Sequence, residues 1–149
     1  MGRLYSALMD AVSVSAARDL LRLSAPADAV VVIHEVTVSQ EASETSEQVA
    51  IQLMRASTDG TGTTATARAL EAGDAAFGGT VVTNLTVDTT AGDILRREAA
   101  NLLAGYRYLP TPETRPVISP SGRFVVRLED APAAAQTMTV EVILEEIGG

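Results

Sequence analysis

The chain has 149 residues, the length of a single domain, and carries a formal net charge of −8 from 11 arginines against 19 Asp and Glu residues. It contains one His and no Cys, Lys or Trp, which excludes disulfides, thiolate metal sites and cysteine redox chemistry. The acidic balance disfavours nucleic acid and anionic membranes, and no apolar stretch approaches the roughly 20 residues that cross a bilayer. We therefore expect a protein that is not an enzyme and uses neither a cofactor nor a metal.

Seven segments combine a β-prone composition with the period-two alternation of half-buried strands. The clearest is the last, where Met138, Val140, Val142 and Leu144 share one face and Ile143 breaks the pattern. In chain order the predicted strands are 4–9, 19–23, 29–40, 48–57, 81–87, 124–128 and 138–147.

Three connections separate these strands. Residues 58–67 form a Gly/Thr-rich loop with little that can pack, and residues 71–79 form a second flexible piece. Residues 110–122 hold four of the six prolines, so this Pro-rich loop is expected to run extended.

The segment 90–105 supports two predictions, which the sequence leaves open. A helix is favoured by apolar residues at helical spacing, namely Leu95, Ala99, Leu102 and Leu103. A strand over 94–100 followed by a bend is the alternative, because sheet context overrides local propensity at this length.

These elements predict an all-β fold, an antiparallel two-sheet sandwich of jelly-roll type with about eight strands and at most one short helix. We expect one domain over residues 1–149, in which residues 1–9 are the first strand, an arm, or a strand swapped between subunits. No strand–helix alternation supports a parallel sheet.

The residues that carry chemistry in other proteins are weak candidates here. His34 is expected on the strand face shared by Val32 and Val36, as a structural histidine, because a metal site of the cupin kind needs further histidines. The stretch 59–62 (DGTG) looks like part of a phosphate or calcium loop but lacks the Lys and the serial carboxylates, so a plain turn is predicted. Tyr106 and Tyr108 either anchor an interface or brace the core and the Pro-rich loop.

The order of elements resembles a known family. A strand region DLLRLSAPADAVVVIHEVTVSQ (19–40) precedes EQVAIQLMRAS (47–57), and later come the phrases LPTPE (109–113) and RLEDAP (127–132). In this layout the chain is similar to the small jelly-roll proteins encoded among the head genes of tailed bacteriophages, which are interpreted as capsid decoration, or cement, proteins.

The resemblance implies a homotrimer that is made in the host cytoplasm and binds the major capsid protein on the exterior of the virion. It transfers no catalytic residues. We expect the contacts in the N-terminal segment and in the region before and within the Pro-rich loop: Leu4, Tyr5, Tyr106, Arg107, Tyr108, Pro110 and Pro112. Other functions open on the same fold are a host- or carbohydrate-binding module, a tail or head-completion component, and an enzyme on a jelly-roll scaffold.

Overall fold

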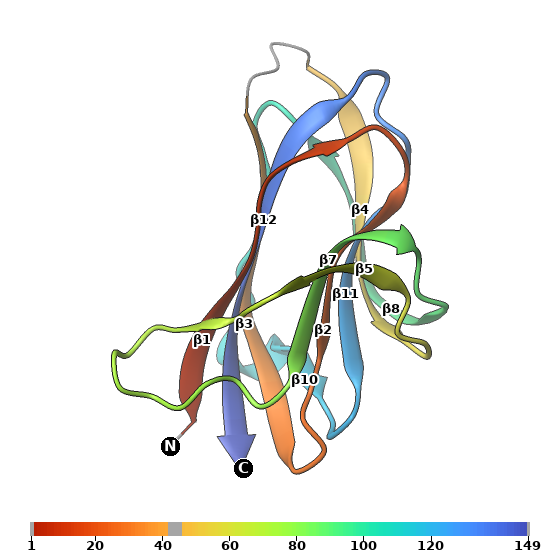
Figure 1. The fold of residues 1–149 in the computed structure, drawn as a ribbon. Coiled ribbons are helices and arrows are strands. Elements are labelled where there is room, and N and C mark those ends of the chain that lie inside the picture. The colour runs from red at the N-terminus through yellow and green to blue at the C-terminus, as the bar shows by residue number, and fades with distance from the viewer. Residues whose placement is uncertain (1, 42–45, 149) are drawn as a thin grey trace.

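The computed structural model describes residues 2–41 and 46–148, which form a sandwich of two antiparallel sheets with six strands each (Figure 1). In sheet A the strand order is β10-β3-β12-β1-β6, and β9 also pairs with β3. Its strands are β1 (Arg3–Val14), β3 (Ala29–Glu41), β6 (Arg68–Ala69), β9 (Tyr106–Tyr108), β10 (Val117–Ile118) and β12 (Gln136–Gly148).

Sheet B has the order β5-β7-β2-β11-β4-β8. Its strands are β2 (Arg18–Ser24), β4 (Gln48–Ala56), β5 (Thr61–Ala65), β7 (Thr80–Val87), β8 (Ala91–Asn101) and β11 (Arg123–Leu128). The described residues contain no α-helix, and their single helical element is the 3-10 turn η1 (Pro112–Thr114).

The core lies between the two sheets and is built by the alternation predicted from the sequence. In β12, Met138, Val140, Val142 and Leu144 are fully buried, and the residues between them face outward. Tyr5 and Phe124 are the largest of the fully buried side chains. Because burying a large apolar side chain contributes roughly 1.5–3 kcal/mol, this core holds the sheets together without a disulfide.

The two-sheet antiparallel sandwich is thus confirmed, the expected number of strands needs correction, and of the two predictions for the segment 90–105 the strand followed by a bend is confirmed. The described residues hold twelve strands and not eight, partly because Thr61–Ala65, expected within a loop, pair with β7 as β5. The segment 90–105 is not a helix, since Ala91–Asn101 form strand β8 against β4 and a turn then ends at Gly105, whose φ is +78°.

A bulge in β3 also corrects the placement of His34. Ile143 of β12 pairs with Glu35 and the next residue pairs with Ile33, so His34 is the extra residue between them. The bulge reverses the alternation, so that Val36 points into the core while His34 lies on the outer face with Val32.

Two connections cross the outer face of sheet B, at the right of Figure 1. The first runs from β4 to β5 and the second from β7 to β8. The two connections lie side by side, as the hydrogen bond from the amide of Ser57 to the carbonyl of Thr90 at 3.0 Å shows. Met54, Leu85 and Val125 are also buried but do not belong to the main core, and Met54 and Val125 pair with each other across β4 and β11.

A buried carboxylate fastens the second connection to the sheet. Asp19 of β2 is fully buried, and its Oδ2 accepts hydrogen bonds from the amide of Thr89 at 2.7 Å and from the Thr89 hydroxyl at 2.6 Å. Its Oδ1 accepts a bond from Arg127 Nε of β11, and Arg127 Nη2 donates to the Thr89 carbonyl at 2.7 Å. These three residues, Asp19, Thr89 and Arg127, are called the Asp19 clip below.

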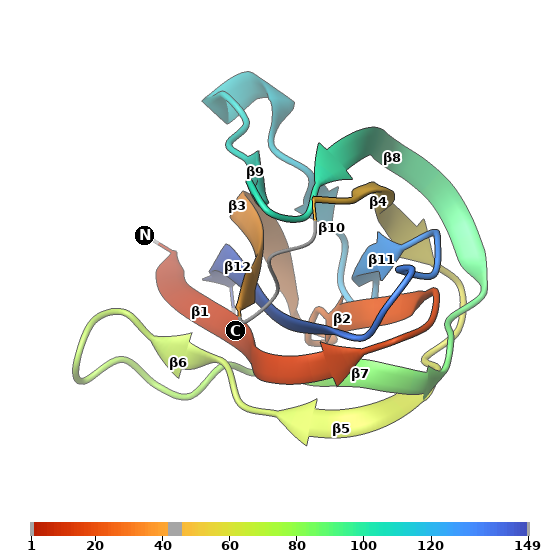
Figure 2. The ribbon, with the colours of Figure 1, turned by 90° about the horizontal axis from the view of Figure 1, so that it is seen from above.

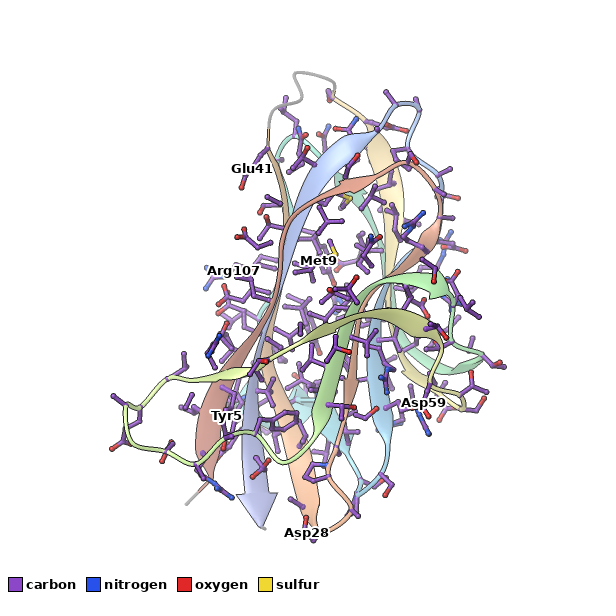
Figure 3. All side chains as sticks on the ribbon, viewed as in Figure 1. Tyr5, Met9, Asp28, Glu41, Asp59 and Arg107 are labelled. Carbon is purple, nitrogen blue, oxygen red and sulfur yellow. The ribbon has the colours of Figure 1, made fainter. Side chains whose placement is uncertain are left out.

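Asp59 holds the first connection in a similar way (Figure 3). Its Oδ1 accepts from Arg22 Nη1 at 2.8 Å and from Arg123 Nε at 2.7 Å, on two neighbouring strands. The hydrogen bond from Arg123 lowers the pKa of the Asp59 carboxyl. Next to it, Gly60 has φ +63°, and a Cβ at this position would lie 2.6 Å from the carbonyl oxygen of Val87. Residues 59–60 therefore belong to a structural crossing fixed by charge and by glycine, whereas residues 61–62, expected in the same turn, begin β5.

Candidate interaction surface

The outer face of sheet A, turned away from sheet B, is the candidate surface. The strand pairing aligns one row of residues across it: Leu4 of β1 pairs with Glu145 of β12, Glu145 with Val32 of β3, and Val32 with Val117 of β10. With strands roughly 4.8 Å apart, Leu4 and Val117 are separated by about 14 Å. The register thus brings the N-terminal segment and the end of the Pro-rich loop, far apart in sequence, onto one face.

Large apolar side chains are exposed on this face. Leu4, Leu8, Ile147 and Val117 are 39% to 49% accessible to solvent, and Val32 between them is half-buried. Side chains of this kind gathered on one sheet face mark a binding surface more often than scattered ones do. These five residues are called the apolar face below.

Two protrusions frame the apolar face, as the view in Figure 2 shows. On one side, the chain after β6 makes an excursion over residues 70–79. On the other side, residues 109–117 project beyond β9 and carry η1. The strands β3, β12 and β1 lie between them, and both chain ends emerge beside this part of the sheet (Figures 1 and 2).

The excursion over 70–79 is anchored from below by Tyr5, which lies in the core. The Tyr5 ring packs against Phe77 at a centroid distance of 5.3 Å, and its hydroxyl donates to the carbonyl of Ala75 at 3.0 Å. Glu146 also holds the excursion, because its carboxylate accepts from the amide of Gly78 and from Arg3 Nη2, each at 2.8 Å. Tyr5 is one of the predicted contact residues, but it is fully buried and positions the excursion over residues 70–79 instead.

An acidic hollow of about 500 Å³ lies between β1 and this excursion. Its walls include Leu4 and Leu70, and the ionisable residues that line it are His34, Glu71, Asp74 and Glu145. His34 Nε2 and Glu145 Oε2 are 2.9 Å apart, so these two groups satisfy each other. Within the described chain, the side chains of Glu71 and Asp74 form no ion pair.

An arginine groove of about 360 Å³ lies on the opposite side of the apolar face, where the protrusion over 109–117 meets the edge of sheet B. Arg55, Arg115 and Glu113 line it together with apolar residues that include Leu95 and Val117. Arg115 Nε is shielded from solvent and has no hydrogen-bond partner within the described chain. Its Nη atoms are not among the buried atoms and form no hydrogen bond or ion pair within the described chain, so these donors of the guanidinium can meet an acceptor from outside.

Tyr106 and Tyr108 brace the sandwich where its two sheets meet. Strand β9 pairs with β3 of sheet A, and Tyr106 is buried against the edge of sheet B. This burial, followed by the nearby charge of Glu98, raises the pKa of Tyr106 to about 12. Arg96 of β8 lies over the Tyr108 ring at 5.0 Å, a cation–π contact between the sheets. Of the two open roles for these tyrosines, bracing is the one that their contacts support.

The remaining predicted contact residues divide by exposure. Leu4, Arg107 and Pro112 are exposed, whereas Pro110 is buried. Arg107 Nε is 2.6 Å from Glu35 Oε1, which ties β9 to β3. The sequence prediction missed Glu71, Asp74 and Arg115, because a charged residue in a loop carries no periodic signal that would show which face it joins.

His34 bonds to a carboxylate and not to a hydroxyl, so this contact activates no nucleophile. Within residues 2–41 and 46–148, no three His, Asp or Glu side chains are grouped so that they could hold a metal ion. The same residues form no helix of the length and apolarity that crossing a membrane requires.

Comparisons with family models, with curated proteins and with solved structures give no match. The class of the protein is therefore defined by its own fold and surface. It is an all-β protein with two facing antiparallel sheets, one of which presents an apolar face between two protrusions.

Proposed function

We propose that the protein is a capsid decoration, or cement, protein that binds the exterior of a bacteriophage head as a homotrimer and contacts the major capsid protein. The observation that carries the proposal is the apolar face, framed by two protrusions on a rigid sheet. It agrees with a chain that has one His and no Cys, because adhesion needs no reacting group. It also agrees with the family resemblance of the sequence.

The proposal includes a jelly-roll topology, which the strand pairing supports. If β9 and β10 count as one interrupted strand and β5–β7 as an insertion, eight principal strands remain. The first pairs with the last, the second with the second last, and so on inward: β1 with β12, β2 with β11, β3 with β10 and β4 with β8. A long hairpin rolled into two sheets has this nested pairing. The insertion accounts for most of the difference between eight expected strands and twelve.

Binding would act as a staple across capsid subunits. Each apolar contact contributes about 25 cal/mol per Å² of surface removed from water. A trimer that engages several capsid subunits gains effective concentration, so modest single contacts add up to tight retention. The net charge of −8 keeps the unbound protein soluble despite its apolar face.

The test is addition of the purified protein to mature shells that lack it. We expect the protein to co-sediment with shells in a fixed ratio to the major capsid protein and to raise their melting temperature. Leu8→Arg places a charge on the apolar face, outside both the acidic hollow and the arginine groove, and should abolish binding. Val87→Arg is the matched control, because Val87 is an exposed apolar residue of sheet B, and it should bind normally.

Two results would reject the proposal. One is an absence of binding and of thermal stabilisation with the unaltered protein. The other is equal binding by the Leu8 and Val87 variants, which would show that the apolar face is not the contact. A few copies confined to one vertex would indicate a head-completion component instead.

A further inference from the structure

We propose that copies of this chain associate head to tail, with the arginine groove of one subunit docked against the acidic hollow of the next. This inference rests on the trimer of the proposed function and names the surfaces that would hold it together. The occupant of each depression is thus a second copy of the chain. The argument rests on charge, on apolar composition and on the placement of the two depressions.

The two depressions are complementary in charge. The acidic hollow contributes three carboxylates, from Glu71, Asp74 and Glu145, of which only Glu145 has a partner, His34. The arginine groove contributes the guanidinium groups of Arg55 and Arg115, offset in part by Glu113. Such complementarity orients two surfaces and selects the partner.

Arg115 is the centre of the basic side. The other groove cation, Arg55, already lies 3.7 Å from Asp93 and donates from Nη2 to the carbonyl of Val117 at 3.3 Å. Arg115 forms none of the ion pairs found in the described chain, and its Nε is shielded from solvent without an acceptor. A carboxylate from a neighbouring subunit would pair with the Nη groups of Arg115, and an Arg–carboxylate pair is among the stronger ionic contacts in proteins.

Each depression also has an apolar part. Leu4 and Leu70 line the acidic hollow, and both side chains are exposed in the single chain. Leu95 and the exposed Val117 line the arginine groove. Contact between the depressions would remove these side chains from water around the ionic pairs, which strengthens the pairs by lowering the local dielectric constant.

The placement of the depressions decides the geometry of association. They lie at opposite sides of sheet A, one next to β1 and β6 and the other next to β10, and the protrusions beside them point in different directions (Figure 2). A contact between two different patches is heterologous, and it gives a ring when the rotation closes. In such a ring the subunit contact covers Leu4 and Val117, and the rest of the apolar face, Leu8, Val32 and Ile147, stays open to the shell.

The test is sedimentation velocity of the purified protein without shells, so that it does not depend on capsid binding. We expect a trimer for the unaltered protein, weakened by added salt. Arg115→Glu alone, and Glu71→Arg combined with Asp74→Arg, should each raise the dissociation constant by roughly a hundredfold or more, because like charges then face each other. The triple variant exchanges the charges between the two depressions and should recover the trimer.

Arg97→Glu is the control for charge reversal, because Arg97 is exposed on β8, lines neither depression, and within the described chain forms an ion pair with Glu129 alone. It should remain trimeric, and thermal melts should show all variants folded. A monomeric unaltered protein, a triple variant that stays dissociated, or dissociation by Arg97→Glu would each overturn the head-to-tail contact. Shell binding by a monomeric protein would refute this contact while leaving the proposed function intact.

Discussion

Asp19→Asn should be among the most destabilising polar substitutions in this protein. It removes the charge of a carboxylate that is fully buried and that accepts three hydrogen bonds in the Asp19 clip. The variant side chain has nearly the same size, so packing stays the same and the ionic contribution is isolated. What remains is the Arg127 guanidinium without its anion, beneath a connection that Thr89 holds in place.

Removing one partner of a buried ion pair costs about 3–5 kcal/mol. The Arg127 side chain is 20% exposed, so water still solvates part of its charge and the lower end of that range applies. In a protein of this length, 1 kcal/mol shifts the melting temperature by roughly 2–4 °C. We therefore expect a fall of about 6–12 °C.

The assay is thermal unfolding followed by circular dichroism, together with urea titration at pH 7. Asp93→Asn is the matched control, because Asp93 is 81% exposed and lies 3.7 Å from Arg55, and its effect should stay within about 0.5 kcal/mol. The double variant with Arg127→Met should lose less than the sum of the single losses, since the two residues act as one unit. Equal melting temperatures for Asp19→Asn and Asp93→Asn would refute the clip as a source of stability.

Three further predictions concern the crossing and the braced edge. Gly60→Ala should lower the free energy of unfolding by at least about 1 kcal/mol in a urea titration, because the positive φ and a nearby carbonyl oxygen both oppose a Cβ at this position. Gly73→Ala is the control and should cost less, because Gly73 has a positive φ but open space around it. The free energy of unfolding should fall by about 2–3 kcal/mol between pH 10 and pH 12, because the pKa of the Tyr106 hydroxyl is near 10 in the unfolded chain and about 12 in the folded protein. Tyr106→Phe should flatten this part of the curve of unfolding free energy against pH. The pKa of the Asp59 carboxyl is lowered in the folded state, so its contribution to the free energy of unfolding is present above about pH 4 and is lost as the pH falls further. An Asp59→Asn variant that loses as much stability below about pH 4 as the unaltered protein would contradict this.

The strands of the core were predictable because their signal is local. Alternation over Met138–Leu144 follows directly from which side chains face the other sheet, and the structure buries each of the predicted residues. The same reasoning fails at His34, because a bulge depends on the pairing partner and leaves no trace in the period of one strand. It fails again at β5, whose Thr and Gly residues form a strand only because β7 offers an edge to pair with.

The interaction surface was predictable only in part. Leu4 is correctly placed outside, and its alternation with Tyr5 already indicates that the two residues face opposite ways. The bracing role of Tyr106 depends on the meeting of two sheet edges, which no property of residues 105–109 records. Glu71, Asp74 and Arg115 come together with the apolar face through long-range register, and register is fixed by the whole sheet.

The position of β12 has a consequence for how the molecule reaches its native state. This strand is the final one along the chain, yet it lies in the middle of sheet A, between β3 and β1. Until it inserts, both neighbours expose unpaired backbone edges, so nascent or truncated chains carry the aggregation risk that the finished molecule has eliminated. Strand pairings this distant in sequence also slow folding. Shortening the chain within β12 would remove a central strand of sheet A and not an edge strand.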